Sequence, residues 1–456
     1  MSLTMEELTE EVRKGLINTV VVGSVDMQGR LIGKRLTARH FVEMVQKNGK
    51  MSLCYYFLAM TIEGHPGDGY DVAGWDQGWG NGILQLDFGT LCRTPWMDKT
   101  ALLMGDMHDR LSDEPFFCAP RIILRRQVQR LSEKGFRAKV ASELEFHIFH
   151  ESQKSARDKR WVNLDTAQPH HRSMHLLAAS VDEPFMQKVR EGLETAGVRL
   201  EASHPEYGPG QQELNFEPNE PIVMADRHIL VKQAIHEMAN QAGLAATFMA
   251  KFGKDEPGSS CHIHMSLEHI DTGKTAFHDG HGEFGMSKVM RQWLAGLVKY
   301  AAEYTYFLAP YINSYKRLQP NSWAPTKICW GVDNRTSSFR LCSESSQSVH
   351  IECRIGGADL NPYLAFAALI AAGIAGIDEG LELPEPAANN IYTALSLPEL
   401  PKNLKSSVEF MANSTMLKTA LGENVVQHYA NSARIELEEF EKQVTDWELS
   451  RGFDRC

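Results

Sequence analysis

Polar and apolar side chains alternate along residues 140–149, Val-Ala-Ser-Glu-Leu-Glu-Phe-His-Ile-Phe. The β-branched, aromatic and aliphatic residues favour a strand, whose two-residue period places Glu143 and Glu145 on one face and apolar side chains on the other. Two neighbouring carboxylates inside a fold repel each other unless a cation lies between them. The pattern therefore predicts a divalent-cation site, with the solvated face of an edge strand as the alternative.

The same periodicities predict a mixture of helices and strands along the chain. Helices are expected at 4–16, 120–135, 182–196, 225–242, 286–307, 361–379 and 430–449. Strands are expected at 19–25, 30–36, 140–149, 199–203, 211–217, 261–267, 326–332, 338–342 and 350–355. This α+β order has neither the regular βαβ alternation nor the Gly-x-Gly-x-x-Gly turn of a Rossmann domain.

Composition and charge exclude several classes of protein. The chain has 456 residues, 43% hydrophobic and 23% charged, as is typical of a globular protein with more than one domain. Its net charge of -11 argues against a general nucleic-acid surface or an acidic-membrane surface. We therefore expect neither nucleic acid nor membrane as a partner.

Cysteine usage and apolar runs predict a cytoplasmic protein. The eight cysteines are scattered without a Cys-x-x-Cys pair, and the acidic start of the chain lacks the order of a secretory signal. The longest apolar run, 364–377, has 14 residues, which is below the roughly 18 needed to span a bilayer. It is expected to form a buried core helix.

A long glycine-rich loop is predicted at 61–82. It contains four acids and three aromatic residues: Glu63, Asp68, Asp71, Asp76, Tyr70, Trp75 and Trp79. Loops of this length inside a domain are usually functional or disordered, and the aromatic content favours order. The loop is expected to contact a site, although its acids could simply be solvated.

Three further segments carry acids, histidines or an arginine at a spacing that brings them together. They contain Glu206 and Glu213 around a glycine turn, His262 and His264, and Glu352 and Arg354. Each alone could be a polar loop or a structural pair, but four such segments make coincidence the weaker explanation. A set rich in carboxylates, with histidine and without thiolate, suits Mg²⁺ or Mn²⁺ better than Zn²⁺.

Basic residues gather late in this acidic chain. They are Lys316, Arg317, Arg335, Arg340 and Arg354. A planar guanidinium matches phosphoryl and carboxylate groups in bidentate fashion, so these residues are predicted to hold such groups. Surface ion pairs are the alternative.

These segments resemble the glutamine synthetase superfamily, in particular γ-glutamylamide and γ-glutamylpolyamine synthetases, over nearly the whole chain. The motifs are Ser142-Glu-Leu-Glu-Phe146, Pro205-Glu-Tyr-Gly-Pro-Gly-Gln-Gln-Glu213, Gly258-Ser-Ser-Cys-His-Ile-His-Met-Ser266, Asn313-Ser-Tyr-Lys-Arg-Leu318, Asn334-Arg-Thr-Ser-Ser-Phe-Arg340, Ile351-Glu-Cys-Arg354 and Asn361-Pro-Tyr-Leu364. The resemblance implies an N-terminal β-grasp domain (1–112) and a catalytic domain (113–456) with a curved antiparallel sheet and surrounding helices. It also implies a ring homo-oligomer, a dodecamer, with active sites between adjacent subunits.

The resemblance also implies a role for each motif residue. One of two or three Mg²⁺ or Mn²⁺ ions would be held by Glu145, Glu206 and Glu213, and another by Glu143, His262 and Glu352. L-Glutamate would be bound by Arg317, Arg354, Glu145 and the Gly258 backbone. ATP and its transferred phosphate would face Glu201, His264, Ser266, Arg335 and Arg340, with Arg317, Arg335 and Arg340 catalytic.

Two departures from the family pattern concern the nucleophile. Where glutamine synthetases have an Asp in the N-terminal domain and a Glu in the flap to hold ammonium, this chain has Leu53 or a neighbour, and Trp323. Deprotonating ammonium at pH 7 without a carboxylate costs about 4 to 5 kcal/mol, so ammonia is a poor nucleophile here. An indole favours an amine with an apolar body, unless Trp323 merely packs the flap. A third departure, Gln or Ser near position 347 (Gln347 or a neighbour) and His350 in place of the family's Lys and Arg, implies weaker nucleotide binding.

The predicted function is ATP-dependent ligation of the γ-carboxylate of L-glutamate to a primary alkyl-, aryl- or polyamine, through γ-glutamyl phosphate, in amine catabolism. Glutamine synthetase itself, using ammonia, is one alternative. A catalytically silent regulatory or structural member of the fold is the other, against which the intact set of charged residues argues.

Overall fold

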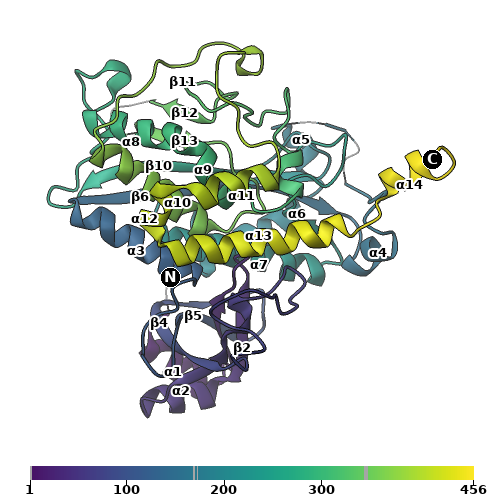
Figure 1. The fold of residues 1–456 in the computed structure, drawn as a ribbon. Helices are drawn as coiled ribbons and strands as arrows, with labels where there is room; N and C mark the ends of the chain where they lie inside the picture. Colours follow the sequence, from purple (N-terminus) through teal and green to yellow (C-terminus); the bar gives the residue numbers. More distant parts are fainter. Residues whose placement is uncertain (1–2, 168–169, 172, 344–347) are drawn as a thin grey trace.

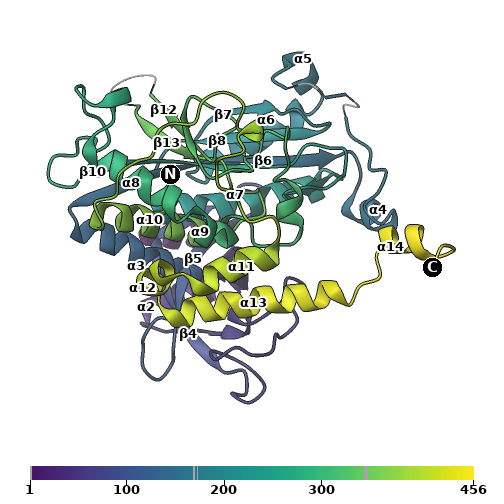
Figure 2. The ribbon, with the colours of Figure 1, turned by 45° about the horizontal axis from the view of Figure 1, so that its top comes forward.

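The computed structural model describes residues 3–167, 170–171, 173–343 and 348–456. Within them the chain forms a five-stranded sheet near the N-terminus and an eight-stranded sheet in the larger remainder. Figure 1 shows the N-terminal sheet below and the larger sheet above, with helices between them, and the turned view of Figure 2 shows the same order. The predicted α+β class is confirmed.

The N-terminal sheet has the order β2-β1-β5-β4-β3, in which β1 and β5 are parallel and the other pairs are antiparallel. Its strands are β1 (Thr19–Val25), β2 (Leu31–Thr37), β3 (Met51–Cys54), β4 (Asn81–Arg93) and β5 (Thr100–His108). Helix α1 (Met5–Arg13) begins at a capping box in which Thr4 and Glu7 each accept a hydrogen bond from the backbone N–H of the other. Together with α2 (Ala38–Gln46), these elements enclose a separate apolar core.

The larger sheet has the order β11-β12-β13-β10-β6-β8-β7, and β9 also pairs with β6. Its strands are β6 (Phe136–Phe149), β7 (Leu200–Pro205), β8 (Gln211–Phe216), β9 (Ala245–Thr247), β10 (Cys261–His269), β11 (Trp330–Val332), β12 (Phe339–Cys342) and β13 (His350–Cys353). All pairs are antiparallel except β11 with β12. The short β11 replaces the longer strand expected at 326–332.

Helices cover one face of this sheet and form most of the core. The long ones are α3 (Pro120–Glu133), α6 (Glu183–Thr195), α7 (Pro221–Gln241), α8 (Lys288–Lys299), α9 (Ala301–Leu308), α10 (Pro362–Asp378), α11 (Leu404–Asn413) and α13 (Glu423–Glu441). Shorter ones are α4 (Gln153–Asp158), α5 (Leu176–Ala179), α12 (Thr415–Leu421) and α14 (Asp446–Gly452). Leu144, Phe146 and Ile148 of β6 point into this core, so their carboxylate neighbours face the other side of the sheet.

A buried arginine joins the two parts of the molecule. Arg121 of α3 forms ion pairs with Asp87 of β4 at 2.7 Å, Asp106 of β5 at 3.0 Å and Asp226 of α7 at 2.8 Å. The predicted boundary at residues 112 and 113 falls between β5 and α3, and it stays a prediction.

Two long helices expected from periodicity are each two helices in the structure. The segment 286–307 is interrupted at Tyr300, which lies outside helical backbone geometry between α8 and α9. The segment 430–449 is divided between α13 and α14, and Thr445 starts α14 with its own capping box. At Tyr300 the buried positions keep their helical spacing from α8 into α9, so periodicity did not reveal that break.

Helix α10 is buried almost throughout, as expected for a core helix. Within the part of the chain that the structure describes, no helix is both long and apolar enough to cross a bilayer. The cytoplasmic location stays a prediction.

The loop 61–82 lies against α13, where Asn431 Nδ2 donates a hydrogen bond to the carbonyl oxygen of Asp68 at 2.8 Å. Its four acids are exposed. Trp75 and Trp79 make an edge-to-face contact at 5.9 Å, and Trp75 remains largely exposed. The predicted contact between this loop and a site stays a prediction.

Candidate active site

Strand register gathers the predicted charged residues on one face of the larger sheet. Residues directly opposite each other in an antiparallel pair point to the same face. Arg340 of β12 is opposite Glu352 of β13, which is opposite His264 of β10. The neighbouring rows are formed by His262 with Glu143, and by Glu145 with Glu213 and His204.

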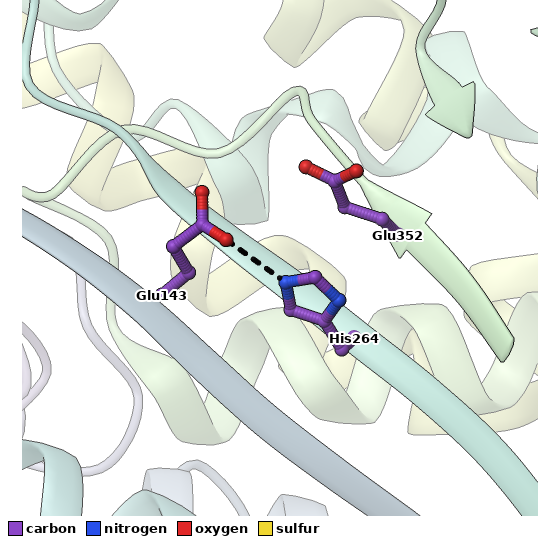
Figure 3. Close-up of side chains that lie close together, drawn as sticks. All are labelled: Glu143, His264 and Glu352. Atoms are coloured by element: carbon purple, nitrogen blue, oxygen red, sulfur yellow. Dashed lines mark hydrogen bonds and ion pairs between the residues drawn. The ribbon is translucent and has the colours of Figure 1, made fainter. Parts of the chain in front are cut away.

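The first cluster consists of Glu143, His264 and Glu352, each with a side-chain ligand atom within 4.8 Å of the others (Figure 3). His264 Nε2 is 3.2 Å from Glu143 Oε2. His262 adjoins the cluster, because its Nδ1 is 2.6 Å from Glu143 Oε1 and 3.3 Å from Glu352 Oε1. Two carboxylates and two imidazoles from three strands therefore surround one point.

Positive groups balance the carboxylates of the first cluster. Arg340 Nη1 donates to Glu352 Oε2 at 2.9 Å, and Arg354 forms an ion pair with the other oxygen of Glu352. Burial alone would raise the pKa of Glu352, but His262 and Arg354 lower it to about 2. Against the same effect of burial, His262 and His264 hold the pKa of Glu143 well below its usual value.

The second cluster consists of His204, Glu206 and Glu213, again with ligand atoms within 4.8 Å of one another. His204 Nε2 is 3.3 Å from Glu206 Oε1 and 3.5 Å from Glu213 Oε1. Glu145 stands opposite Glu213 in the sheet, and its oxygens accept hydrogen bonds from Ser260 N, Ser260 Oγ and Gln211 Nε2 at 2.7, 2.6 and 3.0 Å.

Carboxylates outnumber cations around the second cluster. Burial, Glu143, Glu145 and Glu206 together raise the pKa of Glu213 to about 10. Burial and Glu206 likewise raise the pKa of Glu145 to about 7. Among the described residues, no arginine or lysine forms an ion pair with Glu145, Glu206 or Glu213. This crowding of oxygen ligands fits a divalent cation, which would supply the missing positive charge.

Arg317 and Gly258 lie together beside Glu145. The guanidinium of Arg317 is buried and donates to the carbonyl oxygens of Ile355 and Arg354 at 2.9 and 3.1 Å. A Cβ at position 258 would lie 2.6 Å from Arg317 Cγ, so only glycine fits against this side chain. In the described part of the chain Arg317 forms no ion pair with a carboxylate, and a buried cation of this kind attracts an anion.

The flap residue Trp323 lies near these arginines. Tyr392 Oη donates to the carbonyl oxygen of Ala324 at 2.9 Å. Burial raises the pKa of Tyr392, and Arg354 and Arg317 lie close enough to oppose that rise. Trp323 itself is 63% exposed and has a φ of 62°. The indole is therefore largely at the surface, and Tyr392 connects the backbone of the flap with the predicted glutamate-binding arginines.

The remaining predicted residues are spread over both parts of the fold. Leu53 is buried in the core of the N-terminal sheet, and Glu201 is exposed beside an irregular pairing in β7. Ser266 shares the face of β10 with His264, and exposed Arg335 accepts a hydrogen bond on its carbonyl oxygen from Arg354 Nε. Their assignments to amine or nucleotide stay predictions. Gln347 lies outside the described residues.

The sequence did not point to His204 or Tyr392, and it pointed to His350 only as a departure at a nucleotide-binding position, not as a neighbour of the first cluster. His204 precedes Glu206 by two residues, and that strand spacing was a signal that could have identified it. His350 likewise precedes Glu352 by two residues. Tyr392 lies in a 3₁₀ turn (Ile391–Thr393) distant in sequence from the flap, so no local pattern could connect the two.

Comparison with known proteins gives a family match and full-length relatives. The model of the glutamine synthetase catalytic domain matches residues 117–452. A gamma-glutamylethanolamide synthetase from Streptomyces coelicolor is 43% identical over 453 residues, covering 99% of this chain and 96% of the relative. A glutamate–isopropylamine ligase from a Pseudomonas species is 34% identical over 447 residues, covering 97% and 96%.

A solved structure of GmaS without ligand is also similar, with a TM-score of 0.84 and 26% identity over 98% of this chain and 99% of that one. The predicted fold, an N-terminal β-grasp part followed by a glutamine-synthetase-type part with a curved sheet, is confirmed by these likenesses. The family's use of ATP and a divalent metal agrees with the carboxylate-rich sheet face. The chain belongs to the glutamine synthetase family.

Proposed function

We propose that this protein is an ATP-dependent ligase that joins the γ-carboxylate of L-glutamate to a primary amine other than ammonia, through γ-glutamyl phosphate. The observation that carries the ligase activity is the single sheet face on which two carboxylate–histidine clusters stand beside Arg340 and Arg354. Two full-length relatives, named for ethanolamide synthesis and isopropylamine ligation, support an organic amine as the nucleophile.

The clusters account for the metal requirement of such a reaction. Glu143, His264, His262 and Glu352 would hold one Mg²⁺ or Mn²⁺ ion, and Glu206, Glu213, His204 and Glu145 another, in a site of two or three ions. Bound ions would neutralise the charge that develops on the transferred phosphoryl group.

The arginines act on the two anionic substrates. Arg317, held against backbone carbonyls and unpaired with any described carboxylate, would bind the glutamate carboxylate against Gly258. Arg340 lies beside Glu352 at the edge of the first cluster, where its guanidinium can stabilise the phosphoryl oxygens. The carboxylate oxygen then attacks the γ-phosphorus, ADP leaves, and the amine displaces phosphate from the acyl phosphate.

The flap favours a neutral or weakly basic amine. Trp323 offers apolar surface and no charge where an acid would be needed to deprotonate ammonium. The apolar surface of the flap therefore supports an amine with a hydrophobic body, rather than ammonia, as the nucleophile.

A ring homo-oligomer, a dodecamer, is part of this proposal. Helices lie between the N-terminal sheet and the larger sheet (Figure 1), and the clusters stand on the face of the larger sheet that is turned away from this core. A contribution from β3 to the amine pocket would therefore come from an adjacent subunit. Mass measurement of the native particle tests this assembly.

The test of function is phosphate release from ATP and glutamate with a panel of alkyl-, aryl- and polyamines, each compared with ammonia. We expect release with at least one organic amine to exceed that with ammonia, and mass spectrometry to identify the γ-glutamylamide. Faster turnover with ammonia would favour glutamine synthetase, and no release with any amine would favour a catalytically silent member of the fold.

A further inference from the structure

A cavity of about 810 Å³ lies between the two parts of the molecule, and none of its lining residues belongs to either carboxylate–histidine cluster. The N-terminal part contributes residues of β2 and the start of the loop 61–82. The larger part contributes residues of α7, residues 247–249 and Asp359. Ligand pockets usually measure about 300–1,000 Å³ and combine apolar walls with a few polar groups, so this cavity has the size for a small molecule.

Lys232 of α7 brings a partly buried cation to this cavity. Its Nζ donates a hydrogen bond to the carbonyl oxygen of Ala358 at 2.8 Å and lies 5.3 Å from the centre of the Phe248 ring. Within the part of the chain that the structure describes, Lys232 forms no ion pair with a carboxylate. An ammonium has three N–H donors, so two of them remain for an anionic group in the cavity.

Asp359 supplies a negative group to the same cavity. Its Oδ2 accepts a hydrogen bond from Ser314 Oγ at 2.6 Å, whereas its Oδ1 is buried and has no hydrogen-bond partner among the described residues. Burial lowers the pKa of Lys232 and raises that of Asp359, and each charge partly opposes the shift of the other. The two charges are therefore neighbours that do not form an ion pair, which suits a ligand that carries both charges.

Apolar and acidic side chains complete the lining of the cavity. Tyr56, Ile62 and Met249 line it and are 37%, 40% and 45% exposed, so they offer apolar surface to a ligand. Glu63 and Glu436 also line it, and neither forms an ion pair with another described residue. Their negative charge disfavours a ligand that is only an anion.

We propose that this cavity is a binding site for an α-amino acid with an apolar side chain, whose carboxylate accepts hydrogen bonds from Lys232 and whose ammonium donates to Asp359. The apolar side chain packs against Phe248 and Met249. This site is additional to the proposed function, which assigns L-glutamate to the other side of the segment that follows β13.

The cavity and the proposed glutamate site share a short stretch of backbone. Ala358, whose carbonyl oxygen binds Lys232, donates its own N–H to the carbonyl oxygen of Ser259 at 3.0 Å. Ser259 directly follows Gly258, against which Arg317 packs. An amino acid in the cavity therefore lies next to the backbone that positions the glutamate-binding groups.

The experiment measures binding of L-phenylalanine to the purified full-length protein by isothermal titration calorimetry, without ATP or amine. Lys232→Met keeps an apolar stem beside Phe248, and Asp359→Asn keeps an acceptor for Ser314. Each variant loses a charge-assisted hydrogen bond to the ligand, so we expect each to raise the Kd at least about 10-fold. Lys405→Met, at an exposed lysine of α11 outside the cavity, is the control and should bind like the unmodified protein.

Two analogues of L-phenylalanine separate its charges. 3-Phenylpropanoate lacks the ammonium and 2-phenylethylamine lacks the carboxylate, and each should bind at least about 10-fold more weakly than the amino acid. Equal binding of 2-phenylethylamine would overturn the proposal, because it would assign the cavity to cations through Glu63 and Glu436.

A further titration of L-phenylalanine uses protein saturated with L-glutamate, and the Kd should not change because the two sites are separate. A Kd that rises with the glutamate concentration would place L-phenylalanine in the glutamate site and contradict the proposal.

Absence of L-phenylalanine binding to the unmodified protein, or an unchanged Kd in Asp359→Asn, would also refute the assignment. If Lys232→Met does not fold, Asp359→Asn and the two analogues decide. Because neither ATP nor turnover is involved, these outcomes are independent of the amine screen that tests the ligase activity.

Discussion

The two clusters on the sheet face contain the same kinds of side chain but differ in charge balance. In the first cluster, Arg340, Arg354 and two histidines lower the pKa values of Glu143 and Glu352. In the second cluster, burial and mutual repulsion raise those of Glu145 and Glu213. The first cluster is therefore electrostatically stable as it stands, whereas the second needs an added cation to stay ionised at neutral pH.

We therefore expect the two clusters to contribute differently to the site. Ion pairs within the first cluster hold its side chains in place. Such a fixed arrangement suits the neutralisation of charge on a phosphoryl group. In the second cluster the carboxylates repel one another until a cation binds. The ion bound there should therefore stabilise the folded protein more than the ion of the first cluster. The predictions below test this contrast, beginning with the largest expected effect.

Removing a carboxylate from the first cluster should abolish turnover. We expect Glu352→Ala or Glu143→Ala to reduce phosphate release with glutamate and amine at least about 10³-fold, equivalent to the several kcal/mol that metal ions supply to such transition states. Far-ultraviolet circular dichroism should show the fold retained. Glu283→Ala, an exposed acid paired with Arg291, is the control, and full activity in either cluster variant would remove the metal assignment.

Neutralising one glutamate in each cluster should change stability in opposite directions. In metal-free protein at pH 8, Glu213→Gln should raise the free energy of unfolding by about 1–3 kcal/mol, because it removes a buried and crowded charge. Glu352→Gln should lower it by about 3 kcal/mol, because Arg340 and Arg354 lose their partner. Urea denaturation in EDTA measures both, and changes of the same sign would refute the contrast.

The second cluster should make metal-free stability depend on pH. Because the pKa values of Glu145 and Glu213 are raised to about 7 and about 10, the folded state keeps protons that the unfolded chain loses near pH 4.5. Their contribution to stability therefore falls as pH rises from about 5 to 8. The carboxylates of the first cluster act in the other direction, because their lowered pKa values place their loss of stability below about pH 4.5.

Calorimetry from pH 5.5 to 8.5 should show this decline in EDTA and a smaller one with Mg²⁺. Glu213→Gln should flatten the decline in EDTA. If stability declines with the same slope in this variant, the pH dependence originates elsewhere in the protein.

The smallest effect concerns the choice of amine. Trp323→Glu should shift the ratio of kcat/KM values toward ammonia or cationic amines, since it returns a carboxylate to the flap beside Tyr392. Trp323→Phe keeps an aromatic surface and should preserve the original preference. Identical amine selectivity in all three proteins would show that the flap does not select the nucleophile.

Much of the fold was predictable because its signals are local. The alternation around Glu143 and Glu145 predicted β6 and the side of the sheet its acids face, and the ordered motifs predicted the family, which the comparisons confirm. The break at Tyr300 was missed because an apolar stripe in phase on both sides conceals a single non-helical residue. The separate roles of the motif residues stay predictions.

The amino-acid sequence by itself determined which residues alternate toward one face of each strand, because the two-residue period is a property of the backbone. Only the tertiary structure decided which strands pair and in what register. That register set Glu213 against Glu145 and His204, and Glu352 against His264 and Arg340, and so gave two similar clusters opposite charge balances. Register depends on packing between segments as far apart in the sequence as Glu145 and Glu213 or His264 and Glu352, and electrostatic interactions between them become strong only once burial has removed the water.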